Sequence, residues 1–172
     1  MIKKYFALAT LVTLFGSGCS SSPATPSVSV PTSPSVTLNA ESSCDAVLTV
    51  EEAKTITGIT YTRRDAKINT LGKIVVTNCT YDDDTPKSAV KPFSILTRFA
   101  SNQEEAKTIF EQSKTASYKD GEALTDIGEQ ALWSPMFSQV STIKGQTWLI
   151  VSANKNKEMA IKIAKAVVEK LK

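Results

Sequence analysis

Three cysteines and scattered carboxylates are the residues of this chain that could carry chemistry, because its 172 residues include no histidine. Histidine is the commonest acid–base group near neutral pH, the usual partner of a catalytic serine or cysteine, and the commonest metal ligand. Its absence argues against ordinary hydrolase chemistry. We therefore predict that the protein is not an enzyme and that it has no catalytic, cofactor-binding or metal-binding residues.

Cys19 stands in the sequence context of a lipoprotein acylation site. It follows Phe15-Gly16-Ser17-Gly18, where an apolar run ends in small residues, and a positively charged start at Lys3 and Lys4 precedes that run. The apolar run has about eleven residues, which suits a signal peptide rather than a membrane span of ~20. We predict a signal peptide over residues 1–18 and a lipid on Cys19. Ordinary secretory cleavage that leaves a free thiol is the alternative.

Cys44 and Cys79 are expected to form a disulfide with each other in an oxidising compartment. One cysteine stands ahead of the first predicted helix and the other near the end of the first predicted strand, so the bond would fasten that helix to the sheet. A redox pair and a zinc site are the alternatives. The spacing is unlike Cys-x-x-Cys, however, and two thiols without histidine do not complete a zinc site.

Two groups of carboxylates offer the remaining routes to chemistry. Asp126 and Glu129 lie in a loop ahead of Trp133, and as a pair they would supply a histidine-free enzyme with an acid and a base. Asp82-Asp83-Asp84 could ligate calcium, but three consecutive carboxylates do not match a known calcium-binding loop. We interpret these aspartates as a solvated turn and keep the carboxylate enzyme as an alternative function.

Aromatic and basic residues point to two kinds of ligand. Trp133, Trp148, Phe137 and Tyr118 either line a groove between a β-meander and a helix or fill the core. A lined groove would suit a carrier of a lipid or another small apolar ligand. The lysines of residues 155–172 either face water on an amphipathic helix or contact anionic lipids and acidic wall polymers.

The composition predicts one folded domain behind a tether. Removing Lys3 and Lys4 from the 20 basic residues leaves 18 against 17 acidic ones, a balance that gives no reason to expect a nucleic-acid partner. Residues 19–43 are rich in serine, threonine and proline, which favours an extended tether. Residues 44–172 have the size of one globular domain with a single core.

Helix and strand signals occur in blocks along this domain. Thr49 and Glu52 form a predicted capping box with Gly58 as the helix stop, and Ser101 and Glu104 form a second box. The expected helices cover residues 49–57, 101–117 and 156–171, and the expected strands cover residues 73–81, 93–99, 130–133, 136–143 and 146–153. We expect the first two strands to pair antiparallel and the last three to form a meander. The order α-β-β-α-β-β-β-α predicts an α+β fold, with an antiparallel sheet of about five strands covered by about three helices.

Four segments of the chain together resemble a known kind of domain. They are Cys44-Asp-Ala-Val-Leu48-Thr49-Val-Glu-Glu52-Ala53, Cys79-Thr80-Tyr81, Asp126-Ile-Gly-Glu-Gln-Ala-Leu-Trp133 and the closing helix rich in alanine and lysine. In this order, behind a lipid-bearing cysteine and a stalk of serine and proline, they resemble the small secreted lipoprotein domains of unknown function that are common in actinobacteria. The resemblance covers about residues 44–172. It implies a paired-cysteine α+β domain at the cell surface and carries no established activity.

These features together predict a protein of the bacterial cell envelope, held by the lipid on Cys19 at the extracytoplasmic side of a membrane. Its domain is expected to be a binding or interaction module rather than an enzyme. An envelope protein, a wall polymer or a small ligand is the expected partner.

Overall fold

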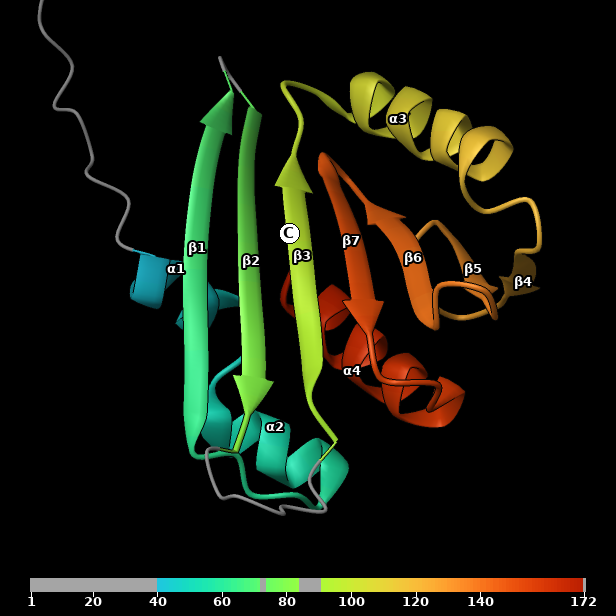
Figure 1. Cartoon of the computed structure of the whole chain (residues 1–172). Helices are drawn as coiled ribbons and strands as arrows, with labels where there is room; N and C mark the ends of the chain where they lie inside the picture. The colour runs from blue at the N-terminus through green and yellow to red at the C-terminus, as the bar shows by residue number, and fades with distance from the viewer. Residues whose placement is uncertain (1–39, 72–73, 84–90, 172) are drawn as a thin grey trace, which may run out of the picture. The chain divides into compact units, whose positions relative to one another are not determined.

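The computed structural model describes residues 40–71, 74–83 and 91–171 (Figure 1). All of them belong to one compact unit, Val36–Lys172. The predicted signal peptide, Cys19 and the predicted tether as far as residue 39 lie outside the described residues.

In the part of the chain that the structure describes, a seven-stranded antiparallel sheet with flanking helices makes up the fold, which confirms the α+β class. The helices are α1 (Ala40–Val47), α2 (Val50–Thr57), α3 (Gln103–Ala116) and α4 (Lys157–Lys170), and the strands are β1 (Arg63–Leu71), β2 (Ile74–Asp82), β3 (Phe93–Phe99), β4 (Glu122–Leu124), β5 (Gln130–Ser134), β6 (Gln139–Lys144) and β7 (Thr147–Ser152). The strands lie in the order β1-β2-β3-β7-β6-β5-β4. The predicted number of about five strands is therefore wrong, because β1 and β4 were missed, and α1 is a further helix.

β1 was missed because its sequence has the composition of a solvent-facing edge strand. Asp65, Lys67 and Asn69 are exposed, whereas the alternating Ala66 and Ile68 are only half-buried. Antiparallel pairing with β2 along its whole length stabilises the extended backbone, and the side-chain pattern does not reveal this pairing. β4 was missed for another reason, because three residues are too few to show an alternating pattern.

One face of the sheet carries the main core. Alternate side chains of the central strands are buried on this face, among them Cys79, Tyr81, Ile95, Leu149 and Val151. α1 packs on β1 and β2, α4 packs on β6 and β7, and α2 packs on α4. In Figure 1, α1 and α4 accordingly lie behind the sheet.

The opposite face is covered by α3 over one half of the sheet. α3 packs on β6 and β7, where Phe110 joins Tyr118, Leu132 and Ile143 in a second, smaller core that packs against Trp148. This contact explains how an indole on the face opposite the main core is shielded from water. Towards β1, β2 and β3, none of the described helices lies in front of the sheet (Figure 1).

The start of α2 confirms the first predicted capping box. The Glu52 amide donates to Thr49 Oγ1 (3.2 Å), and the Thr49 amide donates to the Glu52 carboxylate (2.8 Å). Gly58 follows the helix with φ of +73°, a left-handed conformation that glycine adopts without a steric penalty. Both ends of α2 are therefore fixed by local sequence.

The start of α3 corrects the second predicted capping box by one residue. Asn102, not Ser101, is the N-cap, and its side-chain oxygen accepts a hydrogen bond from the Glu105 amide (2.9 Å). The Glu105 carboxylate in turn accepts from the Ser101 amide (2.8 Å). Glu105 therefore takes the role that the sequence assigned to Glu104, because asparagine is at least as good an N-cap as serine.

Two runs of consecutive strands meet at β3 and β7. The predicted antiparallel pairing of β2 with β3 and the predicted meander of β5, β6 and β7 are confirmed. β3 pairs with β7 over Ser94↔Ser152 to Phe99↔Thr147. α3 lies between the two runs in the chain, because it connects β3 to β4.

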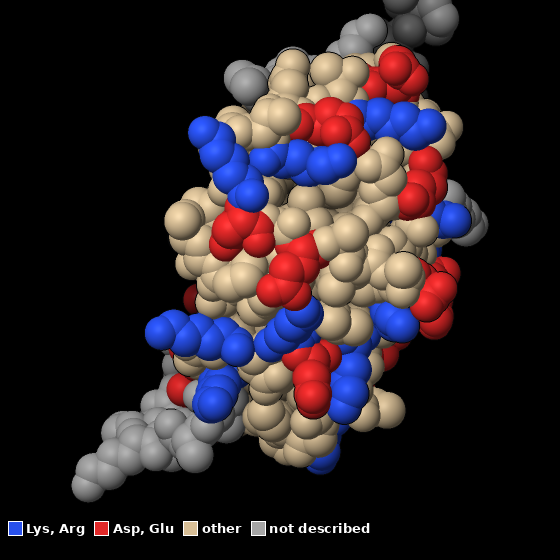
Figure 2. Space-filling view, turned by 90° about the vertical axis from the view of Figure 1, so that its right-hand side faces the viewer, with Lys and Arg blue, Asp and Glu red and all other residues tan. Residues whose placement is uncertain are grey.

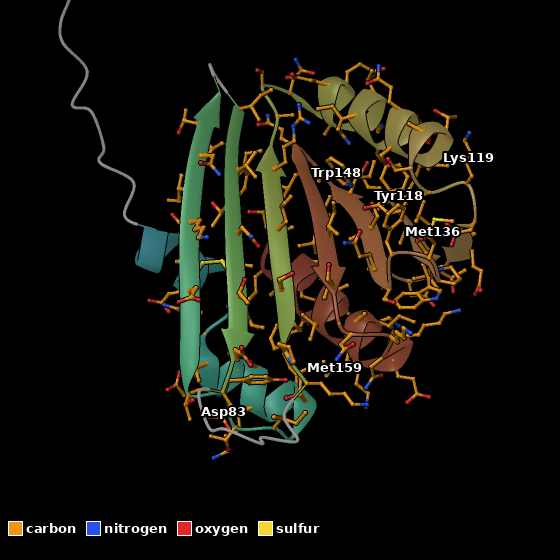
Figure 3. All side chains as sticks on the ribbon, in the orientation of Figure 1. Asp83, Tyr118, Lys119, Met136, Trp148 and Met159 are labelled. Carbon is orange, nitrogen blue, oxygen red and sulfur yellow. A yellow bond between two sulfur atoms is a disulfide. The ribbon has the colours of Figure 1, made fainter. Side chains whose placement is uncertain are left out.

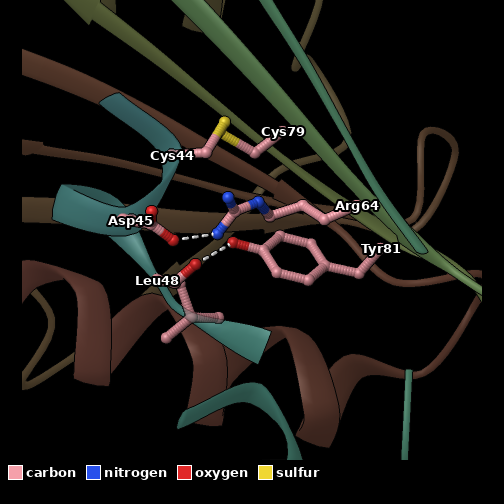
Figure 4. The surroundings of a disulfide bond; sticks show 6 residues. All are labelled: Cys44, Asp45, Leu48, Arg64, Cys79 and Tyr81. Atoms are coloured by element: carbon pink, nitrogen blue, oxygen red, sulfur yellow. Dashed lines mark hydrogen bonds and ion pairs between the residues drawn. A yellow bond between two sulfur atoms is a disulfide. The ribbon is translucent and has the colours of Figure 1, made fainter. Parts of the chain in front are cut away.

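The Cys44–Cys79 disulfide is present, as predicted, and joins α1 to β2 with the two Cα atoms 5.8 Å apart (Figure 4). Cys44 lies within α1 rather than ahead of the first helix, because that helix begins at Ala40. Both cysteines are buried in the main core. Burial keeps the bond away from thiols in solution, which favours a structural role over the redox alternative.

Two polar contacts surround the disulfide. The Arg64 guanidinium pairs with the Asp45 carboxylate, which ties α1 to β1, and the Tyr81 hydroxyl donates to the Leu48 carbonyl oxygen (Figure 4). Burial is the main cause that raises the pKa of Tyr81, so its hydroxyl keeps the proton that it donates. α1 is thus held to the sheet by covalent, ionic and hydrogen-bond contacts together.

Candidate functional site

A groove of about 780 Å³ lies between the sheet, α1 and the end of α4. Ala46 and Val47 of α1 form one wall, Leu171 after α4 contributes to a second, and Val75 of β2 and Phe99 of β3 contribute apolar surface from the sheet. Phe99 is 38% exposed although it is large and apolar. We name this feature the α1–α4 groove. Its size falls within the range of small-molecule sites, and its apolar walls are typical of them.

Threonines stand at the base of the α1–α4 groove. Thr77 and Thr147 line the groove and are 2% and 4% exposed, and Thr97 is directly opposite Thr77 on the neighbouring strand at 1% exposed. The Thr97 hydroxyl has no hydrogen-bond partner among the described residues. Buried threonines therefore lie on three adjacent strands, and Thr77 and Thr147 among them face a groove whose lining also includes Ser43, Gln103, Gln146 and Lys170.

Glu129 holds the rim of the groove where α3 begins beside the β6–β7 turn. Its carboxylate accepts hydrogen bonds from the Gly145 amide (2.8 Å) and from the Gln103 side-chain amide (2.9 and 3.1 Å), and the Lys107 ammonium lies 3.9 Å away. Gly145 and Gln103 both line the groove. The Gly145 amide is the main cause that lowers the pKa of Glu129. Glu129 is therefore an ionised positioning residue and is poorly suited to donate a proton near neutral pH.

Lys170 stands at the opposite rim and is already paired. Its ammonium lies 2.7 and 2.8 Å from the two oxygens of the Glu52 carboxylate. The contact with Lys170 is the main cause that lowers the pKa of Glu52, and the Thr49 amide lowers it further. This pair joins the last turn of α4 to the first turn of α2, so the rim carries a fixed ion pair rather than a free positive charge.

The other predicted carboxylates do not join this site. Asp126 is exposed with φ of +61°, and none of the Glu129 contacts described above involves it. Asp82 and Asp83 accept hydrogen bonds from neighbouring parts of the chain, and Asp84 lies outside the described residues. Within the described ranges, no group of three or more histidine, cysteine, aspartate or glutamate side chains is arranged to hold a metal ion.

The four predicted groove aromatics are divided between the two faces of the sheet. Trp133 is 5% exposed in the main core. Trp148 is on the other face with its indole N–H donating to Ser141 Oγ (2.8 Å), near Tyr118 in the smaller core (Figure 3). The Phe137 ring packs edge-on against Tyr118, with centroids 5.6 Å apart. A single groove lined by all four is therefore wrong, and both tryptophans serve as packing residues.

A second groove, of about 530 Å³, lies between α3 and the strands β4 and β5. Tyr118 is the member of the aromatic set that lines it, together with Lys114 and Lys119. Lys114 is paired with Glu111 (2.9 Å) and lies 5.7 Å from the centroid of the Phe110 ring. Because this groove is smaller and carries two lysines, we take the α1–α4 groove as the candidate site for an apolar ligand.

Charges are mixed over the side of the molecule shown in Figure 2. Lysine and arginine side chains alternate there with aspartate and glutamate, and no large area of one sign is visible. Among the described residues, the Lys157 ammonium pairs with the Glu122 carboxylate, which joins α4 to β4. Lys162 and Lys165 of α4 are exposed, as expected of a water-facing helix surface, and a contact with acidic polymers stays a prediction.

Among the groove residues, Lys170 belongs to the lysines of residues 155–172, which were predicted either to face water or to contact anionic lipids and acidic polymers, and none of the others was predicted to contact a ligand. Thr97 and Thr147 nevertheless occupy inward positions of strands whose other inward residues are apolar, such as Ile95 and Leu149. A polar residue on the buried side of a strand was the available signal. It went unused because threonine is common in strands.

The chain matches no protein-family model, and comparison with curated proteins and with solved structures finds no similar one. No described helix is long and apolar enough to cross a membrane. Function is therefore inferred from the geometry of the groove and its surroundings.

Proposed function

We propose that this protein is a lipid-anchored envelope protein whose domain binds a small, largely apolar molecule in the α1–α4 groove without catalysing a reaction. The groove itself is the observation that supports this proposal, because it offers about 780 Å³ between apolar walls. Its rim is held in place before any ligand binds, by Glu129 on one side and by the Glu52–Lys170 pair on the other. Such preorganisation reduces the entropy that binding would otherwise cost.

The chemistry of the rim supports binding rather than catalysis. A catalytic acid or base works best with a pKa near the operating pH. Glu52 and Glu129, the carboxylates bound to the groove-lining residues Lys170, Gly145 and Gln103, have lowered pKa values because neighbouring N–H groups donate to them. They stabilise the shape of the site, and the chain has no histidine to take the catalytic role.

Attachment at Cys19 is the second part of the proposal. The buried Cys44–Cys79 disulfide suits an oxidising, extracytoplasmic compartment, and about 20 residues between Cys19 and Ala40 would reach at most ~70 Å. Cys19→Ala should move the protein from the membrane fraction to the soluble fraction while the circular dichroism of the folded domain stays unchanged. A variant that remains in the membrane fraction would refute the anchor.

Native mass spectrometry of the protein purified from its own cells tests the groove. A retained small molecule is expected in the wild type, and Val75→Trp should largely displace it, because Val75 lines the groove and the larger side chain would project into it. Val76→Trp is the matched control, because the next residue along β2 points to the opposite face of the sheet. A retained mass that survives Val75→Trp would place the ligand elsewhere and contradict the proposal.

A further inference from the structure

We infer that the ligand of the α1–α4 groove is an uncharged amphiphile, a hydrocarbon chain that ends in a hydroxyl or carbonyl group, and that its polar end enters first. This inference rests on the proposed function and names the class of ligand. Three observations carry it: the threonines at the base of the groove, the neutralised charge at its rim, and the apolar surface between them.

The base of the groove is suited to a small hydrogen-bonding group. Thr77 and Thr147 line the groove from strands on either side of β3. Thr97 is opposite Thr77 on β3 and has an unpartnered hydroxyl, whereas Thr147 is opposite Phe99. A buried hydroxyl without a partner is energetically costly. A ligand hydroxyl or carbonyl beside Thr77 and Thr147 would hydrogen-bond to these threonines, whereas a plain hydrocarbon would not.

The rim is suited to a ligand without charge. Lys170 is the one charged residue among the described residues that line the groove, and its ammonium is held by Glu52. An anionic end group would therefore enter without a free cation and close to the C-terminal end of α4, where the helix dipole is negative. A cationic end group would find no carboxylate among those lining residues. Burying an unpaired charge is costly in either case.

The space between base and rim is suited to a hydrocarbon chain. Val75 and Phe99 are directly opposite each other on β2 and β3, and Leu171 faces the groove from the end of α4. A chain lying across these side chains would cover the part of Phe99 that is exposed to water. The hydrophobic gain from this contact supplies affinity, and the threonines supply orientation.

Calorimetric titration with three probes of equal chain length tests the inference. The protein begins at Ser20, which keeps the whole compact unit Val36–Lys172, and the probes are 1-dodecanol, dodecanoate and dodecyltrimethylammonium. We expect 1-dodecanol to bind at least tenfold more tightly than either ion, because each ion would bury an unpaired charge. Tighter binding of an ion would overturn this inference while the proposed groove stands. Failure of all three probes to bind would refute both.

Substitutions within the groove separate the contribution of the threonine hydroxyls to ligand affinity from the contribution of the apolar side chains. Thr77→Val should weaken 1-dodecanol about fivefold through the lost hydrogen bond, and Thr80→Val, on the same strand but the opposite face, should leave it unchanged. Phe99→Ala should weaken all probes that bind by about tenfold or more, because it removes apolar contact. Thr147→Ser keeps a hydroxyl and should retain binding. If Thr77→Val binds 1-dodecanol as tightly as the wild type does, the inference that the ligand's polar end lies beside the threonines is overturned.

A final arm distinguishes the source of the ligand. 1-Monooleoylglycerol is offered once in buffer and once within phosphatidylcholine vesicles. Depletion from the vesicles would support a membrane lipid as the source, and binding only from buffer would support a dissolved molecule of the same class.

Discussion

Removal of the Cys44–Cys79 disulfide is expected to lower the free energy of unfolding by about 4 kcal/mol. The bond closes a loop of 35 residues. In the chain-entropy model, a loop of this length restricts the unfolded chain by about 13 cal/mol/K, which is about 4 kcal/mol at 25 °C. Typical domains have a net stability of only ~5–15 kcal/mol. The loss is therefore large enough to bring the protein close to unfolding at growth temperature.

Urea unfolding of the chain that begins at Ser20 measures this loss. We compare the oxidised wild type, the wild type equilibrated with a phosphine reductant, and Cys44→Ala/Cys79→Ala. With a slope of about 2 kcal/mol/M, both altered forms should unfold at a urea concentration lower by about 2 M, and their slopes should rise because the unfolded chain expands. The reductant should have no effect on the double alanine variant.

The reduced wild type separates two explanations of the result. It keeps both buried sulfur atoms, so its stability changes through the unfolded chain and not through a packing defect. If the alanine variant loses stability and the reduced wild type does not, the bond acts through packing and the entropic reasoning is refuted. A loss below about 1 kcal/mol in both forms would show that the other contacts of α1 are sufficient to hold it.

Two further predictions concern a close backbone approach and the rim of the groove. Gly128→Ala should cost about 3 kcal/mol or more in urea unfolding, because Gly128 has φ of +60° and an added Cβ would lie 2.3 Å from the Ile143 carbonyl oxygen. Gly58→Ala, at φ of +73° with open space around it, should cost only about 1 kcal/mol, and equal losses would show that the close contact is unimportant. The pKa of Glu52 is lowered by Lys170 in the folded protein, so its contribution to stability is complete above pH ~4.5 and is lost as the pH falls through the lower folded value. Glu52→Gln should remove the loss of stability that protonation of Glu52 causes at acid pH. This loss should be less than about 1 kcal/mol, because the Glu52–Lys170 pair is exposed. Identical stability profiles of the two proteins from pH 6 to 3 would contradict the role of Lys170 in lowering this pKa.

Helices and strands with a clear local sequence signal, such as a capping box or alternating apolar residues, were predicted from the sequence. The capping box of Thr49 with Glu52 lies where the sequence placed it, and β3 has its predicted bounds because its apolar residues alternate without a break. The pairing of Cys44 with Cys79 followed from the count of cysteines and their chemistry. These features depend on residues that are close in sequence or few enough to pair by elimination.

The candidate site depends on long-range contacts, which the sequence pattern does not encode directly. β1 becomes a strand through its partner β2, and α1 has a weak helical sequence that is held by the disulfide and by the Arg64–Asp45 pair. Glu129 looked like a candidate acid because it stands in a loop, but the folded chain brings the Gly145 amide to its carboxylate. The α1–α4 groove could not be predicted from the sequence, because its walls come from segments at both ends of the domain that meet only in the folded chain.

The junction between β3 and β7 bears on when during folding the α1–α4 groove forms. Every other strand pair of the sheet joins neighbours in the sequence, and such local pairs form early because little chain entropy is lost in closing them. β3 and β7 are separated in the chain by α3 and three strands, so their pairing closes a longer loop and is expected to form later. Thr77 stands on one side of this junction and Thr147 on the other, so partly folded chains have no groove. A bound ligand would consequently stabilise only the completed molecule, and it would slow the opening of the sheet at the step that joins its two halves.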